Sequence, residues 1–398
     1  MCLIRDPIQC IIPPHILDAL ANSRDARIRQ AALDTLKVSA FIRGRRSVLG
    51  SLRAALPTAA TQGMQRTIYD SKSQDSDPPS GDRVRGEGDT PSDDPAVNEA
   101  YDGLGATYTF YAEVFDRDSI DAHGLPMNAY VHYAQAFNNA FWDGAEMVFG
   151  DGDGIVFDRF TKSLDVIGHE LTHGVTENTA ALVYHKQPGA LNESISDVFG
   201  SLVKQYHLNQ TADKADWLIG AELLAQGIHG KALRSMADPG SAYDDAKLGG
   251  KDPQPKHMDD YLQLPDTRPG DFGGVHINSG IPNHAFYLVA TQIGGHAWDH
   301  AGHIWYTALK QLSEQSQFQD CANITTQVAS SLYGTNSAEH KAVKDAWAQV
   351  GLPVDQPTPE ATRRKPAKGK AADADGVALK KQLERVVQEL KKTIDLLG

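Results

Sequence analysis

Apolar residues recur at two different spacings along this chain. Over residues 163–352 they recur at intervals of three and four, which is typical of helices, with polar loops around 235–260 and 264–282. Over residues 106–154 β-branched, aromatic and small residues alternate, around one helix-like stretch at 128–138. The pattern therefore predicts a strand-rich lobe followed by a helical lobe.

Both ends of the chain have patterns of their own. Residues 15–42 have helical apolar spacing that is interrupted at Asn22-Ser23 and ends at Arg43-Gly44-Arg45-Arg46, which predicts two short helices with a basic end. Residues 353–376 form a linker rich in Pro, Ala, Lys and Asp. Beyond it, apolar residues at spacings of three and four predict an amphipathic helix. This helix either docks or dimerises, which would make the protein an oligomer, or is only an amphipathic tail.

The composition is that of a globular protein of two to three domains, with 398 residues of which 41% are hydrophobic and 22% charged. Three cysteines, Cys2, Cys10 and Cys321, cannot form a disulfide framework. The chain lacks the run of roughly eighteen apolar residues that a membrane-spanning helix needs. It also shows no cleavable secretory signal, so a cytoplasmic precursor is an alternative to a secreted protein.

Charge is distributed unevenly. The net charge is −13, and residues 61–354 carry 19 basic and 40 acidic side chains, whereas residues 1–60 carry 9 basic and 4 acidic ones. A negative field repels phosphate backbones, which excludes nucleic acid as a partner. The same field favours docking of the chain's own basic N-terminal segment.

A metal-binding pattern begins at His169. His169 and His173 stand four residues apart in a segment with helical spacing, so both imidazoles lie on one helix face, where they can bind one zinc ion. Glu170 lies about 100° round the same turn, close enough to reach a water on the metal without being a ligand. Two ordinary histidines on a polar face would give the same spacing.

A second helical segment strengthens the zinc interpretation. Glu193 offers a third ligand, and Asp197 faces the same way, where its carboxylate can accept the proton on the far nitrogen of a ligating histidine. Two His and one Glu leave the fourth zinc position open to water, which marks a catalytic site. A solvated helix face is the alternative interpretation of Glu193 and Asp197.

These motifs resemble the zinc site of the thermolysin-like neutral metalloproteases. The resemblance continues through Asn138–Trp142, Leu233–Met236 and Asp271–Gly280, and covers about residues 65–353. It implies an α+β, two-lobed thermolysin-like (zincin) fold, with the zinc helix between a strand-rich N-terminal lobe and a helical C-terminal lobe. The segment Cys10-Ile-Ile-Pro-Pro14 resembles the short propeptide of the protealysin-like subgroup.

The resemblance also implies domain limits: a propeptide at 1–60, a strand-rich catalytic lobe with the zinc helix at 61–182, a helical catalytic lobe at 183–353, and a linker with a C-terminal helix at 354–398.

The resemblance implies a role for each further site residue. Glu170 is the acid–base residue, Tyr184 and His276 hold the developing oxyanion, and Asp271 orients His276. Without the resemblance, His276 would be interpreted as a loop histidine. The residues that bind the substrate main chain are Asn139, the backbone carbonyl of Ala140, and Arg234. The apolar pocket for the residue after the scissile bond is built from Phe157, Phe160, Val166, Ile219 and Leu233.

One departure from the family concerns calcium. Of the acidic positions of the family's paired calcium site only Asp165 and Asp216 remain, while Lys204, Leu218 and Ala221 replace the others. A protonated lysine repels calcium, so we expect this double site to be absent.

We therefore expect a single-zinc metalloendopeptidase that cuts peptide or protein substrates on the amino side of bulky hydrophobic residues. It would be made as a zymogen whose own propeptide is an intramolecular inhibitor, with a maturation cut within about 43–65. Cys10 either places a thiolate near zinc or is a partly buried propeptide thiol. The alternative function is that of a zinc-containing binding or regulatory protein whose cleft stays covered by its N-terminal segment.

Overall fold

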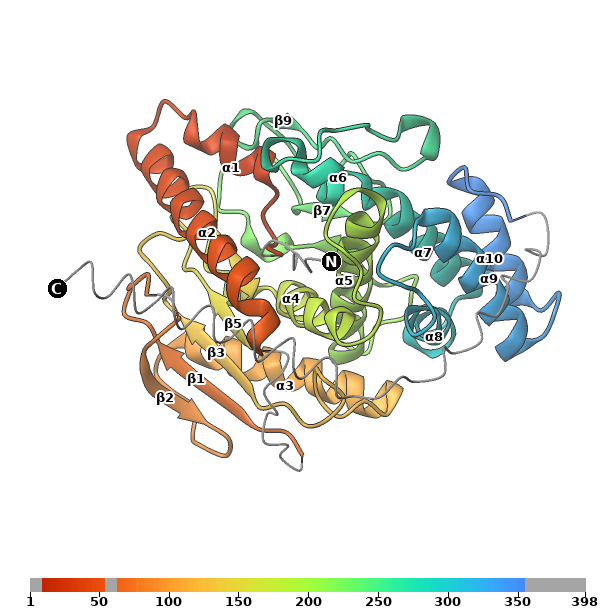
Figure 1. Ribbon diagram of the computed structural model, residues 1–398, viewed down its shortest axis with the longest axis horizontal. Helices are drawn as coiled ribbons and strands as arrows, with labels where there is room; N and C mark the ends of the chain where they lie inside the picture. The colour runs from red at the N-terminus through yellow and green to blue at the C-terminus, as the bar shows by residue number, and fades with distance from the viewer. Residues whose placement is uncertain (1–8, 54–62, 77, 355–398) are drawn as a thin grey trace, which may run out of the picture. The chain divides into compact units, whose positions relative to one another are not determined.

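A five-stranded mixed sheet forms the first lobe in the computed structural model, which describes residues 9–53, 63–76 and 78–354 (Figure 1). The strand order is β2-β1-β3-β5-β4, with β1–β3 and β3–β5 parallel and both outer pairs antiparallel. The strands are β1 (Arg66–Asp70), β2 (Asp82–Gly86), β3 (Met127–Val131), β4 (Ala140–Trp142) and β5 (Glu146–Phe149).

Successive side chains of a strand point to opposite sides, and β3, β4 and β5 bury side chains on both faces of the sheet. Ala129 and Met147 belong to the main core. Tyr130, Phe141 and Val148 belong to a second cluster on the other face, together with Val38 and Ile42 of α2. The N-terminal region therefore covers one face of the catalytic sheet.

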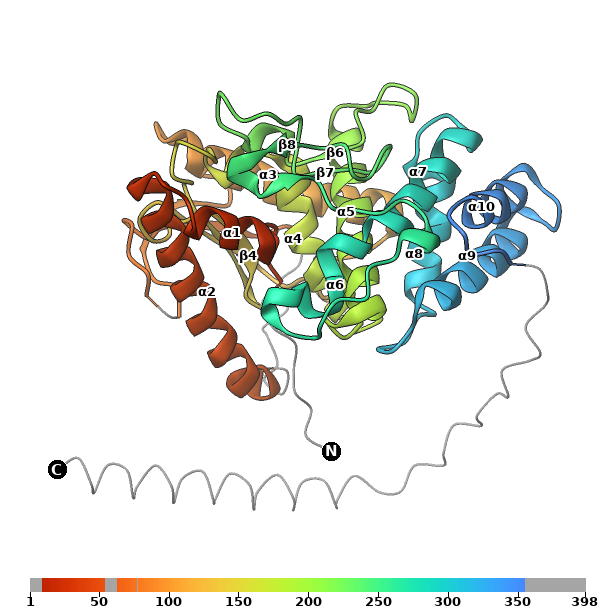
Figure 2. The same ribbon diagram turned by 90° about the horizontal axis from the view of Figure 1, so that it is seen from above.

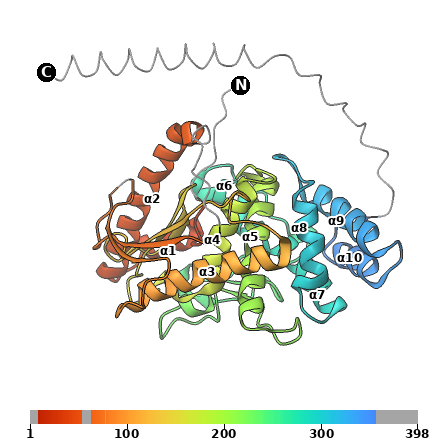
Figure 3. The ribbon, with the colours of Figure 1, turned by 90° about the horizontal axis from the view of Figure 1, so that it is seen from below.

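The main core side of the sheet is covered by α3 (Pro95–Phe115), a long helix that the alternation over residues 106–154 did not predict (Figure 3). Asp94 caps this helix by accepting the N–H of Ala96, with Pro95 at its first turn. The helix-like stretch at 128–138 was also a wrong prediction, since it contains β3 and a loop. A sequence that mixes aromatic and small residues is compatible with both a helix and a strand, and tertiary packing determines which of the two forms.

The N-terminal region forms two helices, α1 (Pro14–Ala21) and α2 (Ala26–Arg53), separated where the sequence predicted. The predicted end at Arg43–Arg46 is wrong, because α2 continues to Arg53. Three arginines and one glycine can continue a helix, so α2 does not end at Arg43–Arg46. Figures 1 and 2 show α1 and α2 side by side, and α1 also packs against the short turns Ala246–Leu248 and Arg268–Gly270.

The second lobe is helical, as predicted. Within the region predicted as a loop at 264–282, the structure instead has α6 and the start of α7. The helices of this lobe are α5 (Lys186–His207), α6 (Asp271–Asn278), α7 (Gly280–Ile293), α8 (His303–Leu309), α9 (Phe318–Tyr333) and α10 (Ala338–Gln349), with the two-residue pairs β6 (Leu218–Ile219) with β7 (Arg234–Ser235) and β8 (Asp244–Asp245) with β9 (Gly250–Lys251).

Among the described residues, no helix combines the length and apolar character that crossing a bilayer requires. The predicted linker and C-terminal helix at 354–398 lie outside the described residues apart from Val354, as does Cys2.

Candidate metal centre and active site

The metal centre lies where α4 (Leu164–Glu177) packs against α5. Two glycines let the helices approach closely: a Cβ on Gly168 would lie 3.1 Å from the Cα of Gly200, and a Cβ on Gly200 would lie 2.3 Å from the carbonyl oxygen of Asp165. This close approach brings Glu193 of α5 opposite the two histidines of α4.

His169, His173 and Glu193 are fully buried, and their ligand atoms all lie within 4.8 Å of one another. The two Nε2 atoms are 3.0 Å apart, and each lies 3.5 Å from a carboxylate oxygen of Glu193. The three residues that the sequence assigned to zinc are thus brought together.

Their hydrogen bonds prepare both rings for a cation. Nδ1 of His169 donates to Asp197 at 2.8 Å, and Nδ1 of His173 faces the side-chain oxygen of Asn192 at 2.9 Å. Asn192 uses its amide nitrogen to donate to the carbonyl of Leu182, so its oxygen is left to accept from His173. Each ring therefore carries its hydrogen on Nδ1, and two Nε2 lone pairs face each other. Such a pair is stabilised by a shared metal ion, so the donor set fits zinc.

Asp197 connects the metal ligands to the substrate-binding residues. Although burial opposes its ionisation, Arg234 and His169 hold the pKa of this carboxyl below its usual value. Arg234 donates to both carboxylate oxygens at 2.8 Å, and the side-chain nitrogen of Asn283 donates to one of them at 2.8 Å. The bidentate pair fixes the Arg234 guanidinium beside the metal centre.

Glu170 is buried beside these ligands and accepts the backbone N–H of Trp142 at 3.2 Å. Burial, followed by the charge of Glu193, raises its pKa well above the usual value, while the backbone N–H groups of Trp142 and Ile11 act in the opposite direction. Within the described part of the chain, its second oxygen has no hydrogen-bond partner. A carboxyl group held this way can accept and return a proton.

His276, Tyr184 and Asp271 form a cluster on the other side of the centre. Nδ1 of His276 bonds to Asp271 at 2.5 Å, and its Nε2 lies 3.1 Å from the Tyr184 hydroxyl, which donates to Glu193. Despite its burial, Glu193 and Asp271 raise the pKa of His276 to about 9. The backbone of residues 271–274 is left-handed, and it lets Asp271 also accept the backbone N–H groups of His276 and Ile277. This turn holds the His276 imidazole toward the centre.

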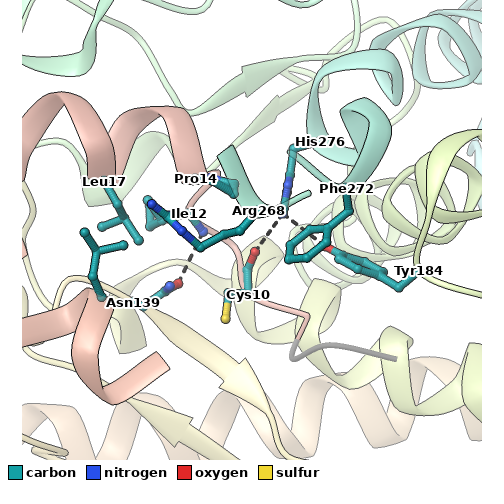
Figure 4. Close-up of a pocket in the computed structure, with 10 residues that line it drawn as sticks. Cys10, Ile12, Pro14, Leu17, Asn139, Tyr184, Arg268, Phe272 and His276 are labelled. Carbon is teal, nitrogen blue, oxygen red and sulfur yellow. Dashed lines mark hydrogen bonds between the residues drawn. The ribbon is translucent and has the colours of Figure 1, made fainter. Parts of the chain in front are cut away.

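The chain's own residues 10–12 lie in the cleft (Figure 4). The Ile11 N–H donates to the carbonyl of Ala140 at 3.5 Å, and the Ile12 N–H donates to the side-chain oxygen of Asn139 at 3.2 Å. Arg234 donates to the carbonyl of Ile11 at 3.1 Å. The three groups that the resemblance assigned to the substrate main chain therefore contact the main chain of the N-terminal segment.

The predicted pocket residues are all buried and belong to one core cluster, which also contains Ile11. Phe157 and Phe160 have ring centroids 5.9 Å apart, and β6 pairs with β7 so that Ile219 is opposite Arg234 and next to Leu233. Val166 joins them from α4. Phe160 comes from the short 3-10 turn Phe160–Lys162, Val166 from α4 and Ile219 from β6, whereas Phe157 and Leu233 lie in loops.

Cys10 enters the cleft through its backbone. Its carbonyl accepts from Nε2 of His276 at 3.0 Å, and in Figure 4 its thiol points to the opposite side. The thiol side packs in the second cluster with Val38, Ile42 and Phe141, and Cys10 is not among the grouped metal ligands of the described residues. Cys10 is buried, and the charge of its thiol is one of the causes that raise the pKa of Tyr184.

Lys204 stands where the family's calcium site would be. Its ammonium group lies 3.0 Å from Asp165 and 2.9 Å from Asp216. Although burial opposes it, these carboxylates raise the pKa of Lys204 above its usual value. A lysine charge therefore balances the buried carboxylate of Asp165 in this structure.

Replacing Lys204 by Met is expected to lower the free energy of unfolding by about 3–5 kcal/mol, because it leaves Asp165 buried without its counter-charge. Lys214, whose pair with Asp213 is exposed, is the matched control, and Lys214→Met is expected to cost less than about 1 kcal/mol. Urea unfolding of both variants measures the difference. Equal losses in the two variants would show that the buried lysine has no special role.

Sequence reasoning assigned no role to several residues that position the site. Asn192 and Ser196 contact Nδ1 of His173, and Asn283 contacts Asp197. The available signal was polar side chains at buried positions of otherwise apolar helices. That signal does not say which partner each side chain has.

The two lobes, arranged about this metal centre with its buried carboxyl group, have the architecture of a metallopeptidase. The chain belongs to the thermolysin metallopeptidase family, whose catalytic domain matches residues 58–177 and whose alpha-helical domain matches residues 180–352. The family is zinc-dependent, and its members are peptidases.

Relatives of nearly the same length share about half of the sequence. An extracellular metalloprotease of Pectobacterium carotovorum subsp. carotovorum is 50% identical over 88% of this chain and 98% of the relative, and protease PrtS of Photorhabdus sp. (strain Az29) is 47% identical over 86% and 92%. Among solved structures, the precursor of protealysin, a metalloproteinase from Serratia proteamaculans, has a TM-score of 0.77 and 49% identity, covering 86% of this chain and 99% of that one.

Proposed function

We propose that this zinc metallopeptidase is an endopeptidase that cuts on the amino side of bulky hydrophobic residues, and that residues 1–60 are a propeptide covering its cleft. The occupation of Asn139, Ala140 and Arg234 by residues 11 and 12 carries the proposal. We also propose that the strand-rich catalytic lobe comprises residues 61–182 and that the helical catalytic lobe comprises residues 183–353. Secretion is part of the proposal, supported by relatives named as extracellular.

His169, His173 and Glu193 would hold the zinc ion, which supplies a Lewis acid and an activated water. Glu170 would accept a proton from the attacking water and return it to the leaving amine. His276 and Tyr184 stabilise the charge that develops on the carbonyl oxygen, and Asp271 keeps His276 oriented. Arg234 and Asn139 align the substrate main chain across the site.

Peptides that differ only in the residue after one bond test this specificity. After removal of the N-terminal segment, we expect the bond before Leu or Phe to be cut at least about 10-fold faster than the same bond before Gly or Asp. Equal rates would refute the specificity. If removing the segment releases no hydrolysis at all, the protein is a zinc-containing binding protein rather than an active protease.

A pH dependence of propeptide docking follows from His15 of α1. Its Nε2 lies 2.9 Å from the Tyr243 hydroxyl, its Nδ1 is buried without a partner, and burial lowers its pKa from 6.5 to about 4. A lowered pKa means that its contribution to stability is complete above pH 6.5 and is lost as the pH falls toward 4. The charged groups acting on it are Asp271, His276, Asp18 and Arg234.

The His15→Gln variant of the precursor is expected to lose less stability than the unsubstituted precursor between pH 7 and pH 4.5. Both proteins also carry Glu170→Gln to prevent cleavage. Urea unfolding at each pH measures this difference. Parallel pH curves for the two proteins would contradict the role given to His15.

A further inference from the structure

The N-terminal segment lies in the cleft in the direction and register of a substrate. Cys10 pairs antiparallel with Phe141 of the edge strand β4, as an added strand would. Each of the next main-chain groups then meets a residue expected to hold substrate: Ala140 and Arg234 hold Ile11, and Asn139 holds Ile12.

This register identifies one peptide bond. The carbonyl of Cys10 accepts from Nε2 of His276, the residue expected to stabilise the reacting carbonyl oxygen. The nitrogen on the other side of that bond belongs to Ile11, which donates to the carbonyl of Ala140 in β4, and Trp142 of the same strand donates its backbone N–H to Glu170. Ile11 itself is fully buried, and both Ile11 and Ile12 belong to the main core cluster, which also contains the pocket residues. The Cys10–Ile11 bond therefore lies between the oxyanion-stabilising residue and the acid–base residue.

We propose that the zinc-loaded precursor hydrolyses its own Cys10–Ile11 bond, so that this segment is a substrate as well as a cover. Water adds across the bond: its oxygen joins the carbonyl carbon of Cys10, the C–N bond breaks, and the proton carried by Glu170 goes to the nitrogen of Ile11. The products are a peptide that ends in the carboxylate of Cys10 and a chain that begins at Ile11. This inference rests on the proposed endopeptidase function.

The cut alone does not open the cleft, because the described residues after the bond have contacts of their own with the catalytic lobes. Ile12 remains bound to Asn139, Asp18 to Arg268, His15 to Tyr243, and Thr35 accepts the backbone N–H of Asn138. The chain beginning at Ile11 therefore stays docked. We expect no gain in casein hydrolysis from this first cut.

The test adds one equivalent of zinc to metal-free precursor and follows intact mass and the new N-terminus. We expect a chain that begins at Ile11, formed at a rate that stays constant over a 100-fold dilution because the bond is already seated in its own cleft. The Glu170→Gln precursor is expected to stay uncut. Ile11→Gly is expected to slow the cut at least about 10-fold, and the adjacent control Ile12→Gly is expected to slow it much less.

The register is also measured without catalysis. In metal-free Glu170→Gln precursor, the amides of Ile11 and Ile12 are expected to exchange hydrogen at least about 100-fold more slowly than in unstructured chain. Rapid exchange of both amides would overturn the proposed seating. A protein that hydrolyses casein once its N-terminal segment is removed, but never cuts Cys10–Ile11 in the precursor, would refute this inference and leave the endopeptidase proposal standing. A protein that does neither would refute both.

Discussion

Replacing Glu170 by Gln is expected to lower kcat/KM for peptide hydrolysis by about 10³–10⁴-fold while zinc stays bound. The buried carboxyl lies beside the metal ligands without being one of them, so its loss removes proton transfer and leaves the metal donors in place. Steady-state kinetics and metal analysis on the same sample measure both effects.

Glu177, near the end of the same helix, gives the control for this substitution. Glu177→Gln is expected to change kcat/KM by less than about 3-fold, because the residue is outside the catalytic cluster. A Glu170→Gln enzyme with unchanged kcat/KM would contradict the assigned acid–base role. If that variant loses zinc, Glu170 is a metal ligand, which would contradict its assignment as the acid–base residue beside the metal.

Replacing Asp197 by Ala is expected to weaken zinc binding about 10–100-fold and to lower the free energy of unfolding by about 3–5 kcal/mol. The first effect arises because His169 loses the acceptor that fixes its hydrogen on Nδ1. The second arises because Arg234, which is 1% exposed, loses its buried counter-charge. Competition with a chelator measures the zinc affinity, and urea unfolding of the metal-free protein measures stability.

Asp266 is the control for Asp197, because it also pairs with a histidine but at the surface. Asp266→Ala is expected to leave zinc affinity unchanged and to cost less than about 1 kcal/mol. If Asp197→Ala behaves like Asp266→Ala, the carboxylate does not orient the ligand histidine.

The sequence predicted the parts of the site that lie within single helices. Spacing alone places His169 and His173 on one face, and it also brings Glu193 and Asp197 to one side of the next helix. The approach of these two helices depends on Gly168 and Gly200, which carry no distinctive pattern in the sequence. The role of His276 came only from the family resemblance. Its orientation depends on a left-handed turn at 271–274, and no regular residue spacing predicts such a turn.

The fold was likewise predicted where the pattern lies within single helices. Helical periodicity beyond residue 163 was sufficient to predict the helical lobe, because the apolar residues of a buried helix face repeat over several turns. The long helix α3 was missed, because nearly all of its positions are buried or half-buried, so that few polar residues mark an exposed helix face. The docking of residues 10–12 into the cleft brings together residues more than 120 positions apart in the sequence, and no local sequence pattern predicts such contacts.

Zinc content and peptide hydrolysis measured together on the mature enzyme test the catalytic role of the metal most directly. We expect one zinc per chain, loss of hydrolysis in parallel with loss of zinc during chelation, and recovery of both when one equivalent of zinc is returned. Full hydrolysis by a sample in which elemental analysis finds no metal would contradict the role assigned to His169, His173 and Glu193.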